Sequence, residues 1–443
     1  MRVVRFFLTL IIAWCGLSAC DTASSIDAPV KNYFLKYFGN DGNQEGVDLV
    51  IDGQNFFYLL GNSVSQVSIN GSRNVNGQQL YLVKADPEGN MVWERSFGGP
   101  LKEEARDIEF TSDGRLIIVG NTETTVGDND VFLITVDTDG NKLDSAVYGF
   151  KNYSEDARTV TEISGAFYVA GSTTNLALKP NPPSGAPPAT DIYDALQLRF
   201  LNTLEPDTLS WRRANGTDQT DVSIKIFPAV PTPGGPLYYV FGYSNKPNLG
   251  DSNNDFNFWY YGIGPTGEPG SADWTLGSPV DDEKLSSVAV ALLSSGDGFI
   301  LTGITTGTSG TDDIYVSKLR KSLAFSAQDL QFSKPLSSTL DQLDPEFERV
   351  SVFPSITSGY LLLANEKTQG NINFYLTKVG NDGSLTWGTP FLIFGGTTHD
   401  DFVGSVSELP DGRIMLFGTM EIGDEGQKKM TLIKVNPNGK FEE

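Results

Sequence analysis

Few side chains in this sequence are suited to acid–base, nucleophilic or metal chemistry. There is one histidine, His399, and the cysteines are Cys15 and Cys20. Zinc sites and Ser-His-Asp triads depend on histidine, so neither is expected. The sequence also lacks a phosphate-binding P-loop, a GxSxG nucleophile elbow and an EF-hand loop. These observations predict that the protein is not an enzyme and that it holds no metal and no cofactor.

Acidic residues recur along the chain and are the candidates for a binding site. Seven polar segments each carry at least one of them, and one from each segment forms the candidate rim: Glu45, Glu104, Asp156, Asp221, Asp282, Glu346 and Asp401. In a structural interpretation, one acid in each segment accepts backbone N–H groups and fixes a turn. In a functional interpretation, the acids form a negative mouth for a cation or for a basic loop of a partner.

These segments are positioned by a repeated strand that ends in a small residue followed by a polar one. Its seven copies are FYLLGNS, LIIVGNT, FYVAGST, YYVFGYS, FILTGIT, YLLLANE and IMLFGTM. Apolar runs of this kind are typical of strands that are covered on both faces. Each copy has a strand before it and a third strand after it, and six are followed by a fourth strand. The turns between them, such as TDGN and NDGS, favour antiparallel connections.

The strand count predicts how the repeats close. The last repeat lacks its fourth strand at the carboxyl end, whereas NYFLKYFG near the amino end has no repeat before it. A ring of sheets has to close, because otherwise two exposed edges remain. The sequence therefore predicts an all-β, seven-bladed β-propeller with four-stranded blades over residues 31–443. Residues 33–38 are expected to be the outer strand of the last blade.

The first 30 residues have the features of a secretion signal. Arg2 and Arg5 precede an apolar run of 12 residues, and a bilayer span needs roughly 20. The run ends in Leu17-Ser18-Ala19-Cys20, which resembles the lipobox of bacterial lipoproteins. The resemblance implies a signal peptide at residues 1–19, a lipid such as palmitate on Cys20, and a tether at residues 20–30. It also implies a place in the bacterial cell envelope, expected at the outer membrane, with the leaflet left open.

The net charge of the chain limits the classes of molecule that are expected to bind it. The formal net charge is -23 at pH 7. Binding to nucleic acid depends on Lys and Arg that face phosphates, so nucleic acid is not expected as a partner. A protein partner with basic or cation-bearing groups is favoured instead.

The repeat as a whole resembles the β-propeller repeats of secreted bacterial lipoproteins. The shared pattern is FGG, an acidic linker, two apolar strands around a DG turn, then K-V-D-x-x-G-N and a tryptophan. The segment ADPEG with Trp93 also looks like the docking repeat of quinone-dependent propeller enzymes, with the Asp-to-Gly spacing one residue shorter. The lipid-anchored propeller subunit of the outer-membrane barrel-assembly machinery has related repeats. The tryptophans are expected to pack on the neighbouring blade; besides Trp93 they are Trp211, Trp274 and Trp387.

We expect a non-catalytic, lipid-anchored binding or scaffold propeller that is a subunit of a bacterial outer-membrane or cell-surface complex. One alternative is a glycan-binding or polysaccharide-active surface protein, for which Trp259, Tyr260 and Tyr261 would be the aromatic candidates. Another alternative is an assembly factor for outer-membrane proteins, by resemblance to the barrel-assembly propeller.

Overall fold

The computed structural model of the chain describes most of the residues after residue 32. The described ranges are 33–64, 77–99, 101–125, 127–178, 193–207, 212–216, 220–246, 255–278, 280–291, 297–307, 312–336, 349–368, 371–387, 392–396, 398–423 and 426–441. The predicted signal peptide, the lipid-bearing Cys20, the tether and Glu346 lie outside these ranges. Within them, no helix is long and apolar enough to cross a bilayer.

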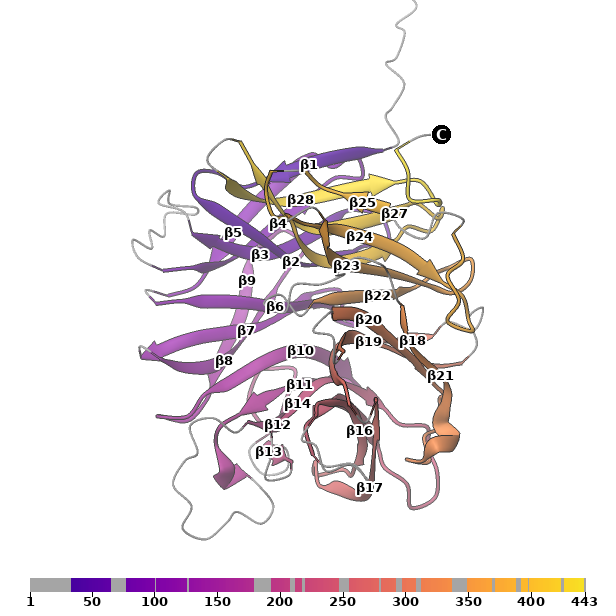
Figure 1. Cartoon of the computed structure of the whole chain (residues 1–443). Coiled ribbons are helices and arrows are strands. Elements are labelled where there is room, and N and C mark those ends of the chain that lie inside the picture. The colour runs from indigo at the N-terminus through magenta and orange to yellow at the C-terminus, as the bar shows by residue number, and fades with distance from the viewer. Residues whose placement is uncertain are drawn as a thin grey trace, which may run out of the picture. The chain divides into compact units, whose positions relative to one another are not determined.

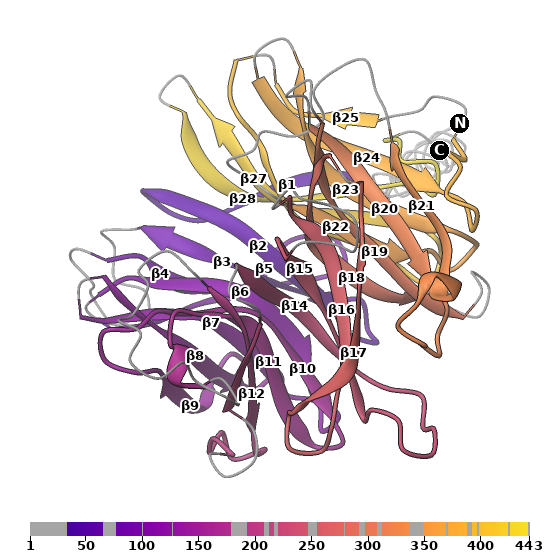
Figure 2. The same ribbon diagram turned by 60° about the horizontal axis from the view of Figure 1, so that its bottom comes forward.

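The described strands form seven four-stranded antiparallel sheets, which fan out as the blades of a propeller (Figures 1 and 2). The predicted fold class is therefore confirmed. From the innermost strand outward, blades 1 to 3 are β2 (Asn43–Ile51), β3 (Phe57–Val64), β4 (Gln79–Ala85) and β5 (Met91–Phe97); β6 (Glu103–Phe110), β7 (Leu116–Thr125), β8 (Asp128–Val136) and β9 (Lys142–Tyr148); β10 (Glu155–Ile163), β11 (Ala166–Thr173), β12 (Asp194–Phe200) and β13 (Arg212–Asn215).

Blades 4 to 7 have the same order of strands. They are β14 (Asp221–Pro228), β15 (Tyr238–Ser244), β16 (Asn257–Ile263) and β17 (Pro269–Leu276); β18 (Asp282–Ala291), β19 (Gly298–Thr306), β20 (Asp312–Leu319) and β21 (Leu330–Leu336); β22 (Val350–Pro354), β23 (Tyr360–Thr368), β24 (Asn371–Val379) and β25 (Leu392–Phe394); β26 (Phe402–Glu408), β27 (Ile414–Ile422), β28 (Gln427–Val435) and β1 (Phe34–Phe38). Short 3-10 turns occur at η1 (Leu176–Leu178) and η3 (Ala327–Asp329).

The ring closes as the sequence predicts, because β1 from the start of the chain is the outer strand of the last blade. It pairs antiparallel with β28, from Phe34 opposite Lys434 to Phe38 opposite Met430 (Figure 1). Strand β1 also contacts blade 1, where the rings of Phe34 and Phe57 lie 6.5 Å apart, edge to face. The closing strand is therefore held by a backbone ladder on one side and by aromatic packing on the other.

The core lies between neighbouring blades, which explains why the second strands are apolar on both faces. In β3, every residue except the last is buried. One cluster joins Phe57 and Leu59 of blade 1 to Met415 and Phe417 of blade 7. A comparable cluster joins blades 2 and 3. Each sheet is covered by a sheet on both sides, so alternation of polar and apolar residues is lost.

The predicted tryptophans that the structure describes pack on the neighbouring blade, as expected. Trp274 packs against the cluster between blades 4 and 5, and Trp211 lies outside the described residues. A Cβ built on Gly140, in the turn of blade 2, would lie 3.2 Å from the Trp93 ring of blade 1. A Cβ on Gly439 of blade 7 would lie 3.2 Å from the Trp387 ring of blade 6. Both indole rings therefore lie against the tight turn of the next blade, and their role is to join blades.

The repeated glycine of the second strand marks the closest backbone contact within each blade. A Cβ built on any of six glycines would lie 1.9–2.3 Å from a carbonyl oxygen of the innermost strand; these are Gly61, Gly120, Gly171, Gly242, Gly303 and Gly418. No ordinary side chain fits at such a distance, so glycine is required. Blade 6 is the exception, with Ala364 at this position.

The same six blades carry a β-bulge in the innermost strand directly beside the glycine. In blade 2, for example, Gly120 pairs with Ala105 and Val119 pairs with Asp107, so Arg106 is the extra residue. The shift recurs at the matching place in blades 1, 3, 4, 5 and 7. In blade 6, β22 pairs with β23 without a shift. A bulge re-aims side chains, and here it acts on the strand nearest the propeller axis.

In blades 1, 2 and 7, the polar residue that follows the glycine ties the blade to the next one. Asn62 Oδ1 accepts the backbone N–H of Ala105 at 2.8 Å, and Asn121 Oδ1 accepts that of Ala157 at 2.8 Å. At the ring closure, Thr419 Oγ1 accepts the N–H of Gly46 at 2.9 Å. The N–H group freed from the sheet at the bulge thus finds a partner on the previous blade.

We expect Gly120→Ala to lower the free energy of unfolding by about 2–3 kcal/mol, because the new Cβ meets a backbone carbonyl that cannot turn aside. The usual effect of this substitution in a strand has the opposite sign, since glycine is the weaker strand residue. Gly53→Ala is the matched control, because a Cβ there meets nothing within 4 Å. Urea unfolding measures both variants, and equal stabilities would contradict the close-contact account.

Candidate functional site

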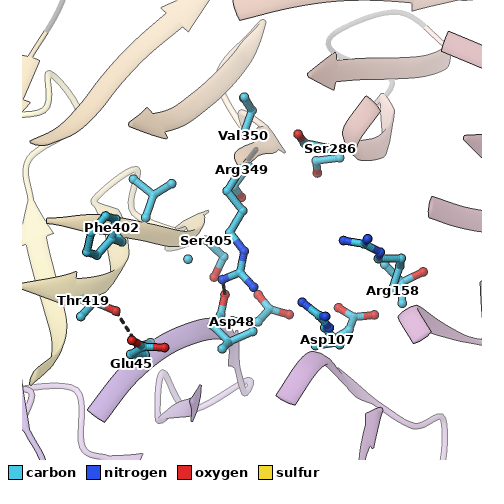
Figure 3. A pocket seen from close by; sticks show the side chains of 18 of the residues that line it. Glu45, Asp48, Asp107, Arg158, Ser286, Arg349, Val350, Phe402, Ser405 and Thr419 are labelled. Atoms are coloured by element: carbon cyan, nitrogen blue, oxygen red, sulfur yellow. Dashed lines mark hydrogen bonds between the residues drawn. The ribbon is translucent and has the colours of Figure 1, made fainter. Parts of the chain in front are cut away.

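A polar cavity of about 470 Å³ lies where the innermost strands of all seven blades meet (Figure 3). The bulges explain its lining. The extra residue of every bulge lines the cavity; these residues are Val47, Arg106, Arg158, Ile224, Ser286 and Gly404. Blade 6 has no extra residue, and its Ser351, which pairs with Leu363 as Asp107 pairs with Val119, also lines the cavity. The cavity is therefore built by the repeat itself, with a contribution from every blade.

Acidic and basic side chains line the cavity in equal number. The acids are Glu45, Asp48, Glu104 and Asp107, and the bases are Arg106, Arg158, Arg349 and Lys428. All but one of the bases are in contact with a carboxylate. Lys428 Nζ lies 2.9 Å from Glu45 Oε1, which bridges blades 7 and 1.

Asp156 holds two of the arginines in place. Its Oδ1 lies 3.1 Å from Arg106 Nη2, and its Oδ2 lies 3.0 Å from Arg158 Nη2. Asn121 also donates to Oδ1. Burial raises the pKa of Asp156, but the charges of Arg158 and Arg106 outweigh it, so the pKa lies below its usual value. The carboxylate is ionised, and it fixes two guanidinium groups at the cavity wall.

Asp48 and Asp107 form a second pair on blades 1 and 2. Burial, and then the charge of Asp107 and a hydrogen bond with it, raise the pKa of Asp48 to about 8. Each carboxyl also accepts backbone N–H groups: Asp48 Oδ1 that of Leu49 at 2.8 Å, and Asp107 Oδ2 that of Val160 at 2.8 Å. At pH 7, Asp48 therefore keeps its proton.

The partly buried Lys225 of blade 4 forms ion pairs with Asp107 and Glu109. Its Nζ lies 3.4 Å from Asp107 Oδ2 and 2.5 Å from Glu109 Oε1, and it donates to the Val160 carbonyl at 3.1 Å. Burial lowers the pKa of Lys225, but the charges of Asp107 and Glu109 more than reverse this effect and raise the pKa above its usual value. A charged lysine thus joins blades 2, 3 and 4 beneath the cavity.

A second set of carboxyls is buried where the chain passes from one blade to the next. They stand two residues before the bulge and are all less than 4% exposed: Glu103, Glu155, Asp221, Glu283 and Asp401. Glu155 Oε2 accepts the N–H of Phe150 at 3.0 Å, and Glu283 Oε2 accepts that of Ser278 at 3.0 Å. The structural interpretation of the acidic segments, an acid that fixes the turn by accepting N–H groups, is therefore observed in these blades.

The candidate rim residues do not gather in one place. Glu45 and Glu104 line the cavity, and Asp156 lies behind it. Asp282 accepts the N–H of Phe256 at 2.7 Å. Asp221 and Asp401 are buried at blade junctions, and Glu346 is not among the described residues. The negative mouth thus stays a prediction, and the carboxylates that do face the cavity share it with arginines.

The other candidates lie away from the cavity. Trp259, Tyr260 and Tyr261 are at most 4% exposed and pack between blades, so they offer no platform for a sugar. His399 Nδ1 lies 3.9 Å from Glu421 Oε2. Among the described residues, no group of three or more His, Cys, Asp or Glu side chains could hold a metal ion.

The cationic residues of the cavity were not found by sequence reasoning. A signal for two of them exists: Glu104-Ala105-Arg106 and Asp156-Ala157-Arg158 are the same acid-Ala-Arg triplet at the same place in two repeats. Arg349 and Lys225 have no such counterpart, whereas Asp48 and Asp107 stand at the same place in the first two repeats. Which of these side chains enters the channel is set by the bulge, which breaks the two-residue period of a strand.

No family model and no curated protein matches the sequence. Solved structures resemble it in fold. A protein of unknown function from Dyadobacter fermentans is 10% identical, with a TM-score of 0.45, over 91% of this chain and 97% of that one. The β-propeller domain of the Trilobed protease from Pyrococcus furiosus is 9% identical, with a TM-score of 0.44, over 89% and 95%. The NanB sialidase from Streptococcus pneumoniae is 10% identical, with a TM-score of 0.44, over 92% and 71%. At such identities the activities of these proteins do not transfer.

The buried junction carboxyls are expected to make stability fall as pH rises. Burial raises the pKa of Asp401 to about 6, of Glu155 to about 7 and of Glu283 to about 8. In the unfolded chain these groups titrate near pH 4, so unfolding between about pH 5 and 8 releases protons. The free energy of unfolding should therefore decrease across this window and level off above it.

Glu283→Gln tests whether Glu283 holds a proton in the folded state, because the amide imitates the protonated acid. The decrease in unfolding free energy between pH 5 and 8.5, measured by urea titration, should be smaller than in the wild type. Asp297→Asn is the control, since Asp297 is 49% exposed and lies outside the junctions. A Glu283→Gln profile that is parallel to the wild-type profile would show that this carboxyl does not hold its proton in the folded state.

Proposed function

We propose that the protein is a lipid-anchored, non-catalytic binding subunit of a bacterial cell envelope, and that it binds its ligand in the central cavity. The observation that carries the proposal is that all seven innermost strands contribute side chains to one polar cavity. Pockets that bind ligands usually combine such a concave site with a few fixed polar groups. The predicted lipid on Cys20 would tether the propeller to the membrane.

The charged groups of the cavity are held in place before any ligand arrives. Asp107 is bound by Lys225 and by the N–H of Val160, and Asp156 is bound by two arginines and Asn121. Side chains fixed in this way lose little conformational entropy on binding. Charged side chains that are fixed in this way support a binding role, because binding needs their orientation and does not need them to transfer a proton.

Blocking the cavity should abolish binding without unfolding the propeller. In a pull-down from solubilised membranes, we expect the wild-type protein to recover envelope partners and Ser286→Trp to lose them, because Ser286 faces the cavity (Figure 3). Ser322→Trp places the same side chain at an exposed turn and serves as the control. Thermal unfolding by circular dichroism verifies that both variants are folded.

The outcome of the pull-down also separates the alternatives. Recovery of barrel-assembly proteins would favour an assembly factor for outer-membrane proteins. Equal recovery by the wild type and Ser286→Trp would contradict a binding role for the cavity.

A second candidate function, a polysaccharide-active enzyme, is favoured by one observation. Burial and the neighbouring Asp107 raise the pKa of Asp48 to about 8, and both carboxyls line the cavity. A pair of carboxyls of which one has a raised pKa is a known basis for hydrolysis. However, Asp48 and Asp107 share a hydrogen bond, whereas glycosidases hold their two carboxyls about 5 Å apart or more. The geometry thus favours binding over glycoside hydrolysis.

Asp48→Asn distinguishes the two candidates. The binding account predicts that neither the wild type nor the variant releases reducing sugar from common polysaccharides. If the wild type hydrolyses one of them and Asp48→Asn loses at least about 100-fold in rate, as expected for a general acid, the protein is an enzyme. Circular dichroism of the variant serves as the control for folding.

A further inference from the structure

Arg349 differs from the other basic side chains of the cavity. It directly precedes β22, in the blade that lacks the bulge, and its side chain reaches across the cavity towards Asp48 (Figure 3). Its single hydrogen bond within the described structure is a long one, from Nη1 to the Val47 carbonyl oxygen at 3.5 Å. A guanidinium group has five N–H donors, so most of its capacity is unused.

The neighbouring cations do not share this property. Arg106 lies 3.1 Å from both Glu104 and Asp156, and Arg158 lies 3.0 Å from Asp156. Lys428 lies 2.9 Å from Glu45. Among the described residues no carboxylate makes an ion pair with Arg349. Each of the other cationic side chains that line the cavity forms an ion pair with a carboxylate.

The carboxyl that faces Arg349 is already engaged. Asp48 Oδ1 accepts the N–H of Leu49 at 2.8 Å, Oδ2 accepts that of Ile108 at 3.3 Å, and the group shares a hydrogen bond with Asp107. Because Asp48 also keeps its proton at pH 7, it offers Arg349 little negative charge. No rearrangement of Asp48 alone would satisfy the arginine without breaking these bonds.

Burial and a neighbouring arginine disfavour the charge of Arg349. Burial, and next the charge of Arg106, lower its pKa to about 10, and Asp48 and Glu104 offset this only in part. A partly buried cation without a counterion is costly, and an anion that enters the cavity would reduce that cost. The cost of this uncompensated charge and the unused N–H donors of Arg349 therefore both favour an anion at this place.

We propose that the cavity binds a small molecule through an anionic group, either a carboxylate or a phosphate, and that Arg349 is the residue that grips this group. The inference rests on the proposed binding function and specifies its ligand. The planar fork of a guanidinium matches both kinds of oxyanion with two parallel hydrogen bonds. A volume of about 470 Å³ lies in the range for small-molecule ligands. The arginines held by Asp156 would face the same ligand from blades 2 and 3.

The test uses three probes built on one sugar: glucuronate carries a carboxylate, glucose 6-phosphate carries a phosphate, and glucose is neutral. Each is titrated into the purified full chain by calorimetry. We expect saturable binding of glucuronate or of glucose 6-phosphate, with no binding of glucose. Preference between the two anions identifies the group, and either preference supports the proposal.

Variants assign the binding to Arg349. Arg349→Ala should lower the affinity for the anionic probe at least about tenfold. Arg349→Lys should bind with intermediate affinity, because it keeps the charge but loses the fork. Arg320→Ala, at an exposed turn, should bind as the wild type does. Circular dichroism shows that each variant is folded, and Arg349→Lys keeps the test decisive should the alanine variant unfold.

Two results would overturn the inference: no binding of either anion by the wild type, or wild-type affinity in both Arg349 variants. Neither result by itself refutes the proposed function. If the pull-down still depends on Ser286 while no anion binds, the cavity is a binding site whose ligand has another chemistry. If the pull-down is also insensitive to Ser286→Trp, the proposed function fails as well.

Discussion

In six of the seven blades, the second strand passes so close to the first that glycine alone fits between a carbonyl oxygen and the neighbouring backbone. This contact accompanies the bulge, and the extra residue of each of the six bulges lines the cavity. In blades 1, 2 and 7, the polar residue after the glycine then binds the N–H group that the bulge frees in the next blade. A short run of sequence, an apolar strand with glycine and a polar residue, thus sets the packing of a blade, its attachment to the next and the lining of the cavity.

Many ionisable side chains are buried in this fold, and their hydrogen bonds and ion pairs compensate the cost of burying them. Four of the buried junction carboxyls, those of Glu103, Glu155, Glu283 and Asp401, accept N–H groups from the linker. Glu155 also accepts the hydroxyl of Thr173 from its own sheet. Asp156 and Asp107 each bind cationic side chains from neighbouring blades. Removing one partner of such a group is costly, so these contacts fix how adjacent blades are oriented. The driving force for folding comes from the apolar layers between blades, which bury both faces of the second and third strands.

The architecture could be predicted from sequence because its signals are local and repeated. Seven apolar strands ending in a small and a polar residue defined the blades, and the unpaired strand at residues 33–38 defined the closure that β1 and β28 make. The cavity could not be predicted in the same way. Arg106 and Arg158 face it because a bulge shifts the register by one residue, and Arg349 faces it from the blade without a bulge. Of the junction acids, Asp221 and Asp401 were among the candidates, whereas Glu103, Glu155 and Glu283 each lie beside one. Their burial depends on how linkers fold back over them, which no spacing in the sequence reveals.

Among the described residues Arg349 has no carboxylate counterion, and we propose that an anionic ligand takes that place. The most direct measurement is a crystal structure of the protein grown in selenate, with data collected at the selenium edge. The account predicts an anomalous peak within hydrogen-bond distance of the Arg349 guanidinium, between β22 and the bulges of β6 and β10. A cavity that holds only water, with Arg349 turned into an ion pair with a carboxylate of the chain, would contradict it.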